Sequence, residues 1–206
     1  MSLNLFDKVF YINCNHRTDR KESIESIFDK LGCVNYERIE AVYLPDNGAL
    51  GCAKSHLLAL NESIKLNLNN VLILEDDFIL NVSPKAFNKK VKKFFETSID
   101  WDVLMLSTNL VKHKKTNFDF LNKVIEAQTT SGYAVNKNYM EKIINNFKEA
   151  EILLDGAERI NGWYKDAIDQ HWKTLQNDNW LSFCPTLGKQ SDGWSDIENR
   201  EVSYGC

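Results

Sequence analysis

The chain has 206 residues, of which 43% are hydrophobic and 26% charged, a composition typical of a globular protein that buries its core in one domain. Its net charge of −4 gives no general attraction to nucleic acid or to an anionic membrane. No stretch approaches the about 20 apolar residues of a membrane span, and the N-terminus lacks the pattern of a signal peptide. We therefore expect a single cytoplasmic domain, residues 1–206, with no membrane span and no nucleic-acid partner.

The first half of the chain alternates strands and helices. Strands are predicted at 8–13, 36–42, 70–74 and 101–107, and helices at 19–31, at 48–67 and from Ser83-Pro84 onward. Asp19 with Glu22 predicts a capping box, and Gly32 predicts a helix end. The inner face of helix 48–67 is predicted to hold Leu57, Leu60, Ile64 and Leu68. This order predicts an α/β fold, with an open, mixed, mostly parallel sheet flanked by helices.

The regular alternation ends after Ser107. Residues 108–122 are polar and basic and are predicted to form a loop, followed by short strands at 124–128 and 133–135 around a turn. Helices are predicted at 136–150 and 166–176. The tail after Pro185 is predicted to be irregular, which favours a functional lid, with plain disorder as the alternative.

Three adjacent carboxylates, Glu75, Asp76 and Asp77, directly follow the buried strand 70–74. In parallel α/β sheets, ligands bind outside the carboxyl ends of the strands. Three neighbouring acids repel one another unless a cation lies among them, and Mg²⁺ or Mn²⁺ is commonly held by one or two carboxylates together with substrate phosphates. The pattern predicts a metal site, with a solvated acidic turn as the alternative.

Arg17 and Arg20 lie at the start of the first helix, where cations are unfavourable. Because guanidinium groups bind phosphates and base edges well, they indicate ligand contact, with solvated charge as the alternative. The glycine-bearing helix start at 48–56 is neither a P-loop nor a GxGxxG motif. A single histidine on a helix, such as His56, is more typical of a hydrogen-bonded structural residue than of a metal ligand.

The five cysteines are odd in number and scattered without Cys-x-x-Cys or His-Cys spacing. They are Cys14, Cys33, Cys52, Cys184 and Cys206. This pattern argues against a zinc site or a disulfide framework and for a reducing compartment.

A general base needs a carboxylate within reach of the proton that it removes. Asp169 lies between Ile168 and the Trp172 turn, so partial burial could raise its pKa. An exposed acid on a helix surface is the alternative.

Several segments, in order along the chain, resemble glycosyltransferase family 25, the lipooligosaccharide and procollagen galactosyltransferase-like group. They are VFYINCNHRTDRKESI at 9–24, IEAV at 39–42, GALGCAKSHLLAL at 48–60, LILEDDF at 72–78 and TTSGYAVNKNYMEKII at 129–144. Asp169 stands where the family has a "P-V-D" acid. The chain departs from the pattern at Asn15-His16, where Asp-Arg is common, and at 165–167, which lacks the proline before the acid, so Asp166 stays an alternative base.

The resemblance implies a GT-A fold and a metal-dependent, inverting transfer of a sugar from a nucleotide-diphosphate donor to a hydroxyl of a glycan or protein. The donor would be a UDP-hexose such as UDP-galactose or UDP-glucose, and the cofactor Mn²⁺ or Mg²⁺. Residues 1–110 would form the donor half, and 111–206 the acceptor side and C-terminal lid. The alternative functions are a catalytically inactive nucleotide-sugar-binding module and a nucleotidyltransferase. The chain could also form oligomers.

The roles that the resemblance implies fall on three groups of residues. Asp77 and Glu75 would bind the metal, and Asp169 would be the catalytic base. The donor-binding residues would be Asn13, Arg17, Arg20, Glu75, Asp76, Ser107, Tyr133, Gln190 and Ser191. The tail from Gln190 to Ser195 would close over the bound donor and exclude water.

Overall fold

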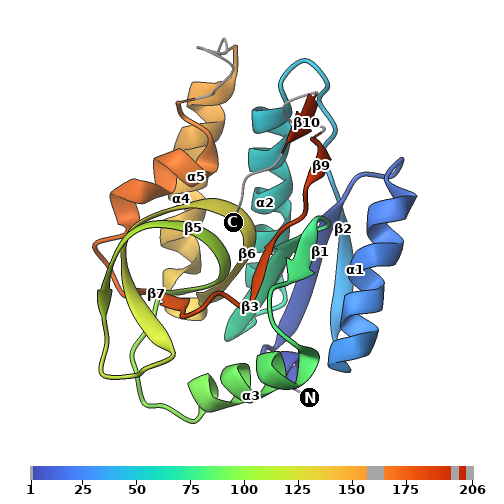
Figure 1. The fold of residues 1–206 in the computed structure, drawn as a ribbon. Coiled ribbons are helices and arrows are strands. Elements are labelled where there is room, and N and C mark those ends of the chain that lie inside the picture. The colour runs from blue at the N-terminus through green and yellow to red at the C-terminus, as the bar shows by residue number, and fades with distance from the viewer. Residues whose placement is uncertain (1, 157–164, 196–199, 203–206) are drawn as a thin grey trace.

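The computed structural model describes residues 2–156, 165–195 and 200–202. Six strands form one twisted sheet in the order β2-β1-β3-β6-β5-β7 (Figure 1). Their bounds are β1 Lys8–Asn13, β2 Tyr36–Glu40, β3 Asn70–Glu75, β5 Val103–Lys115, β6 Leu121–Asn136 and β7 Trp180–Phe183. Among the described strands of this sheet, only β6 runs against the others. The predicted mixed, mostly parallel α/β sheet is confirmed.

Helices cover both faces of the sheet (Figure 1). Their bounds are α1 Thr18–Leu31, α2 Gly48–Lys65, α3 Pro84–Phe95, α4 Lys137–Leu154 and α5 Ile168–His171, with short 3₁₀ turns at Leu3–Leu5 and Trp172–Leu175. The apolar sides of α2, α4 and α5 pack in one core layer, and those of α1 and α3 pack in the other. None of the helices in the described ranges combines the length and apolarity needed to cross a bilayer.

The ends of the early helices follow local chemistry. Gly32 adopts a left-handed conformation (φ 67°) and ends α1 as predicted, and the hydroxyl of Ser83 caps α3. The capping box at Asp19 is wrong, because α1 already begins at Thr18 and its N-cap residue, Arg17, makes no side-chain cap hydrogen bond. Of the residues predicted for the inner face of α2, Leu57 and Leu60 are buried as expected, Ile64 is 42% exposed, and Leu68 lies beyond the helix end at Lys65.

The largest error in the predicted elements lies between Thr108 and Asn122. This stretch belongs mostly to the long antiparallel pair β5 and β6. The outer residues of β5 are exposed, so polar and basic side chains are tolerated there while the backbone hydrogen bonds supply the pairing. Hydrophobic periodicity therefore could not reveal this hairpin.

Two further predictions need correction in the C-terminal quarter. The helix predicted at 166–176 is the four-residue α5 followed by a 3₁₀ turn. The tail is not fully irregular, because β8 (Gly188–Gln190) pairs with β4 (Phe78–Leu80), and β9 (Gly193–Ser195) pairs with β10 (Arg200–Val202). The first pairing brings the tail alongside the residues that follow β3.

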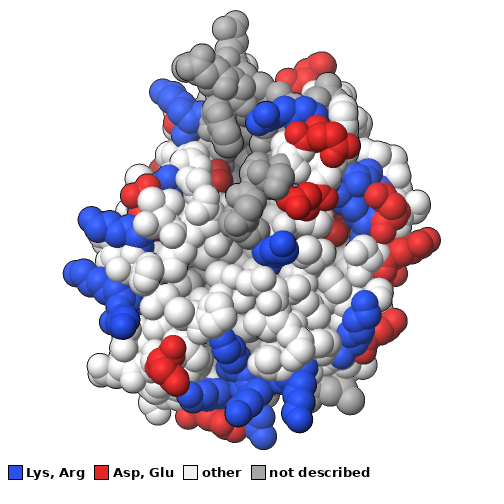
Figure 2. Space-filling view, in the orientation of Figure 1, with Lys and Arg blue, Asp and Glu red and all other residues white. Residues whose placement is uncertain are grey.

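α3 lies at the end of the molecule opposite the β9–β10 pair (Figure 1). Its outward face is rich in lysine, and Figure 2 shows Lys and Arg side chains gathering over that end. Positive charge is thereby concentrated away from the acids that follow β3.

Gly51, in the first turns of α2, permits a close approach to the chain that follows β2. A Cβ atom at this position would lie 2.4 Å from the backbone oxygen of Val42. We expect Gly51→Ala to lower the free energy of unfolding by about 1–3 kcal/mol, because backbone cannot move aside as easily as a side chain. Urea unfolding measures this, with the exposed α2 variant Asn61→Ala as the matched control. Equal midpoints for the two variants would contradict the expected clash.

Candidate functional site

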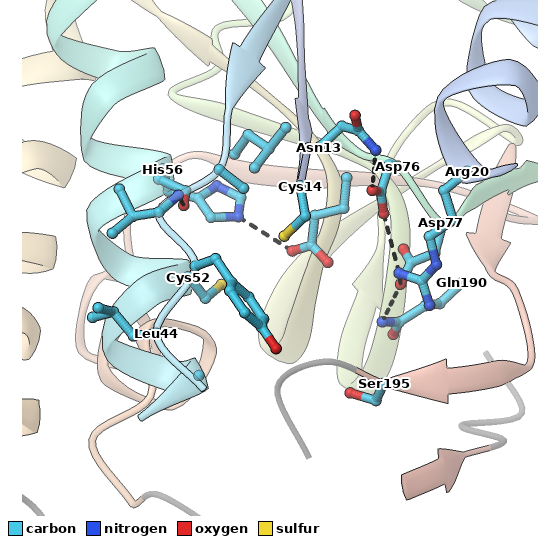
Figure 3. Close-up of a pocket in the computed structure, with 17 residues that line it drawn as sticks. Asn13, Cys14, Arg20, Leu44, Cys52, His56, Asp76, Asp77, Gln190 and Ser195 are labelled. Carbon is cyan, nitrogen blue, oxygen red and sulfur yellow. Dashed lines mark hydrogen bonds and ion pairs between the residues drawn. The ribbon is translucent and has the colours of Figure 1, made fainter. Parts of the chain in front are cut away.

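A pocket opens at the carboxyl ends of β1 and β3 (Figure 3). Its walls come from the chain after β2 (residues 41–44), the first turns of α2, the acids Glu75, Asp76 and Asp77, and the tail residues Gln190 and Ser195. Strand ends, a helix start and a returning tail therefore meet at one place, which is where α/β folds of this kind bind ligands.

Glu75 is the first acid and ends β3. One of its carboxylate oxygens accepts a hydrogen bond from Thr130 (2.5 Å) and lies 3.2 Å from Nε2 of His56. Burial would raise the pKa of Glu75, but the hydrogen bonds from His56 and Thr130 keep that pKa below its usual range. The carboxylate is therefore held ionised and oriented within the pocket.

Asp76 is bound to the first strand and the first helix. Its carboxylate accepts from Nδ2 of Asn13 at 2.7 Å and from the guanidinium of Arg20 at 3.1 Å. Asn13 is fixed in turn by Arg38, whose Nε donates to the Asn13 amide oxygen. Asp76 thus positions Arg20 in the wall of the pocket.

Asp77 is the third acid and is buried, with 7% of its surface exposed. One carboxylate oxygen accepts from Gln190 (3.0 Å) and from Arg20 (3.3 Å), whereas the other, Oδ1, is buried without a hydrogen-bond partner. Burial and the nearby charge of Glu75 raise the pKa of Asp77 to about 7. An orphaned buried carboxylate oxygen costs free energy unless a donor or a cation reaches it.

The tail contacts the same cluster through its backbone. The N–H of Ser191 donates to the carbonyl of Asp77 (2.8 Å), and Arg20 donates to the carbonyl of Trp194 (2.7 Å). Arg17, by contrast, is paired with Asp19 (2.9 Å) and lies with Arg20 and Trp194 around a neighbouring hollow. Arg20 thus bonds directly to Asp76, Asp77 and the tail.

Four of the predicted donor-binding residues do not line this pocket. Arg17 and Ser191 line the neighbouring hollow, and Ser107 and Tyr133 lie inside the protein. Ser107 is buried and shares a hydrogen bond with Ser131, and Tyr133 is fully buried with its hydroxyl 2.9 Å from Nδ1 of His56. Because side chains alternate between the faces of a strand, these two point into the packed layers rather than toward the strand ends. Ser107 and Tyr133 thus lie outside the lining of the described pocket, and donor contact by either of them stays a prediction.

Asp169 lies in the first turn of α5, and one of its oxygens accepts from the backbone N–H of Thr129 at 3.0 Å. Burial raises the pKa of Asp169, the Thr129 hydrogen bond opposes this, and the charge of Glu75 adds to it. The carboxyl group therefore lies close to the acid cluster without lining the described pocket. Asp166, the alternative base, is largely buried and lies 3.8 Å from the ammonium of Lys165.

Thr129 has a left-handed backbone with φ 79°, which is unusual for a β-branched residue. In the pairing of β5 with β6, residues 129–131 lie opposite the single residue Thr108, so this part of β6 bulges out of the ladder. The bulge directs the N–H of Thr129 to Asp169 and the hydroxyl of Thr130 to Glu75. Two carboxylates from distant parts of the chain are thus bound by adjacent residues.

Sequence reasoning missed Arg38, Thr130, Cys52 and the wall at 41–44. Arg38 and Thr130 reach their partners, Asn13 and Glu75, across 25 and 55 positions of the chain, so no local motif indicates them. The prediction that His56 is a hydrogen-bonded residue is confirmed. Cys14, Cys33, Cys52 and Cys184 are not in disulfides, and Cys206 lies outside the described residues.

The fold is that of a GT-A type α/β protein. Two solved structures share the fold at low identity. One is A197 from STIV, which is 11% identical with a TM-score of 0.52; the match covers 95% of this chain and 93% of that one. The other is a glycosyltransferase involved in the glycosylation of the major capsid of PBCV-1, which is 14% identical with a TM-score of 0.52; the match covers 93% of this chain and 96% of that one.

The profile of glycosyltransferase family 25 (LPS biosynthesis protein) matches residues 46–157, and the chain belongs to this family. Procollagen galactosyltransferase 1-A of Xenopus laevis is 29% identical over 129 residues, 49% of this chain and 21% of that protein. A glycosyltransferase 25 family member of Drosophila pseudoobscura pseudoobscura is 23% identical over 134 residues, 52% of this chain and 21% of that protein. The match thus spans about a fifth of the length of these two relatives.

Proposed function

We propose that the chain is a metal-dependent glycosyltransferase that moves a hexose from a nucleotide-diphosphate donor, of the UDP-galactose or UDP-glucose kind, to a hydroxyl of a glycan or protein. The observation that carries the proposal is the buried Asp77 oxygen without a partner, at the strand-end pocket of a family 25 chain. The relatives' names, which include galactosyltransferase, support the choice of a hexose.

The residues present fit a hard divalent cation. Asp77 offers an unpartnered carboxylate oxygen, and Glu75, two residues earlier, offers a second carboxylate at the same pocket. Oxygen donors of this kind suit Mg²⁺ or Mn²⁺. When bound, such an ion neutralises charge on the departing nucleoside diphosphate.

The side chains around the acids have separate tasks in this proposal. Arg20, fixed by Asp76, supplies a positive charge for the donor phosphates, and Asn13 keeps Asp76 in place. Gln190 and Ser191 attach the tail to Asp77, so that the tail can limit access of water to the donor. Asp169 accepts the proton of the acceptor hydroxyl as that hydroxyl attacks the anomeric carbon, in an inverting reaction. Arg17, beside the neighbouring hollow, would contact the donor only at its edge.

A thermal-shift screen tests the donor and the metal together. We expect a UDP-hexose to raise the Tm of the protein only when Mn²⁺ or Mg²⁺ is present, because a ligand that binds the folded state alone stabilises that state. Nucleotide sugars with another nucleobase or another sugar serve as controls for the specificity of donor binding. No shift with any nucleotide sugar and metal would contradict the proposal, and binding without transfer to any acceptor would favour a non-catalytic module.

Metal binding should depend on pH through Asp77. The pKa of Asp77 is raised to about 7, so below that pH the carboxyl is protonated and a proton competes with the metal. We expect the affinity for Mn²⁺ to fall about tenfold for each pH unit below 7 and to level off above it. Mn²⁺ titrations followed by electron paramagnetic resonance measure this. A flat affinity between pH 5 and 8 would show that Asp77 does not bind the ion.

A further inference from the structure

A second group of potential ligands lies in the wall of the pocket that α2 provides. Cys52 and His56 are four residues apart on α2, so their side chains lie on the same face of the helix. Figure 3 shows them across the pocket from Asp77, Arg20 and Gln190. A sulfur, a ring nitrogen and a carboxylate oxygen, from Cys52, His56 and Glu75, all lie within 4.8 Å of one another.

These separations suit one small cation. Zinc binds sulfur at about 2.3 Å and nitrogen or oxygen at about 2.0–2.2 Å, which places tetrahedral ligands roughly 3.5 Å apart. Nε2 of His56 and the Glu75 oxygen are already 3.2 Å apart. Small rotations of the side chains would therefore complete a three-ligand site.

The surroundings of the three ligands also match those of metal sites. The Tyr133 hydroxyl holds the other ring nitrogen of His56, and the Thr130 hydroxyl holds Glu75. Partners of this kind orient ligands and are a regular feature of metal centres. All three ligands line the pocket, which leaves a fourth position and an entry route for an ion.

We propose that Cys52, His56 and Glu75 form a binding site for a borderline-soft divalent cation, with zinc as the natural occupant and an open position facing the pocket. This site shares Glu75 with the oxygen-only site at Asp77 but differs from it in chemistry, because thiolate and imidazole select zinc over magnesium or manganese. Binding releases the proton of the Cys52 thiol to solvent. The neutral His56 ring, which donates from Nε2 to Glu75 in the metal-free protein, carries its proton on Nδ1, toward Tyr133, when Nε2 binds the metal. The negative charges of Glu75 and Asp169, which with burial hold the pKa of the free Cys52 thiol high, favour a cation at this position.

Cobalt is the probe, because Co²⁺ takes the place of zinc and reports its ligands in the absorption spectrum. The full chain, stripped of metal by a chelator, is titrated with Co²⁺ without any nucleotide, so the result does not depend on sugar transfer. We expect a thiolate-to-cobalt charge-transfer band and visible bands of tetrahedral intensity, both removed by added Zn²⁺.

Variants locate the site. Cys52→Ser should abolish the charge-transfer band and weaken Zn²⁺ binding by more than about 100-fold, since loss of an outer partner alone can cost 10–100-fold. Cys14→Ser, which removes another thiol of the same pocket, should keep the band, and so should Asp77→Asn. His56→Asn is the second test in case Cys52→Ser does not fold. This variant lacks the ring nitrogen, so Co²⁺ should bind more weakly and the charge-transfer band should appear only at higher Co²⁺ concentrations.

The inference fails if Co²⁺ gives no charge-transfer band, if the band survives in Cys52→Ser, or if it disappears in Cys14→Ser. Any of these results would leave Cys52, His56 and Glu75 as a hydrogen-bonded group only. The proposed transferase activity would be untouched, because the Mn²⁺-dependent thermal shift with a nucleotide sugar tests it separately.

Discussion

Asp77→Asn should remove metal-dependent donor binding and reduce sugar transfer by at least about 100-fold, while leaving the protein folded. Asparagine keeps the shape of the side chain but loses the charge that a divalent ion needs, and its neutral amide is a poor ligand for Mn²⁺. Gln190 and Arg20 can still donate hydrogen bonds to the amide oxygen of the asparagine, and Arg20 also keeps its hydrogen bond to Asp76. Isothermal titration with Mn²⁺ and donor, together with transfer assays, measures the loss.

The stability of this variant separates a functional role from a structural one. The pKa of Asp77 is raised in the folded state from an ordinary value near 3.8 to about 7, so the stability of the metal-free protein falls as the pH rises between these two values and levels off above pH 7. At pH 8 without metal, Asp77→Asn should therefore melt no lower than the wild type. Asp119→Asn, an exposed acid on the β5–β6 connection, is the control and should affect neither binding nor transfer. A large drop in Tm for Asp77→Asn would instead assign the carboxylate to the fold.

The early part of the fold could be predicted because its sequence patterns are local. Short apolar stretches, Gly32 after α1 and Ser83 before α3 each act over a few residues, and the structure places strands and helices accordingly. The acid cluster at the end of β3 was predictable for the same reason, since strand ends in α/β sheets are where ligands gather.

The errors have a common physical cause, which is that the deciding contact is distant in sequence. The outer part of β5, beyond Leu110, is held to β6 by backbone hydrogen bonds while its own side chains are exposed, so its lysines carry no strand pattern. The directions of Ser107 and Tyr133 depend on the register of the sheet, because a shift of one residue turns a side chain to the other face. The partnership of Thr130 with Glu75 depends on a bulge that becomes visible only once β6 is paired with β5.

The bulge also gives the site a rigidity that the sequence did not indicate. A left-handed threonine costs free energy, so Thr129 keeps this conformation only because its surroundings impose it. Thr108 binds the carbonyl of Gln128 on one side of the bulge, and Ser107 binds Ser131 on the other. The proposed base and the first acid of the cluster are therefore positioned by one short segment of β6.

Asp169→Asn should lower kcat for sugar transfer by roughly 10²–10⁴-fold and leave the affinity for the donor unchanged, as expected for loss of a general base. The N–H of Thr129 can still donate to the asparagine oxygen, so the bulge and α5 should persist. Because burial raises the pKa of Asp169, the wild-type rate should fall with decreasing pH at a higher pH than an ordinary aspartate would cause. Steady-state kinetics over a pH series, with the donor affinity measured in parallel, test both statements.

Asp166→Asn is the matched comparison, because Asp166 lies three residues earlier and was the alternative base on sequence grounds. Asp166 faces the ammonium of Lys165 rather than the bulge that joins Asp169 to the acid cluster. Its removal should change kcat by less than about threefold, because loss of one partially exposed ion pair changes little. If Asp166→Asn lost transfer while Asp169→Asn retained it, the base would be Asp166, and Asp169 would be a buried acid that holds α5 against β6.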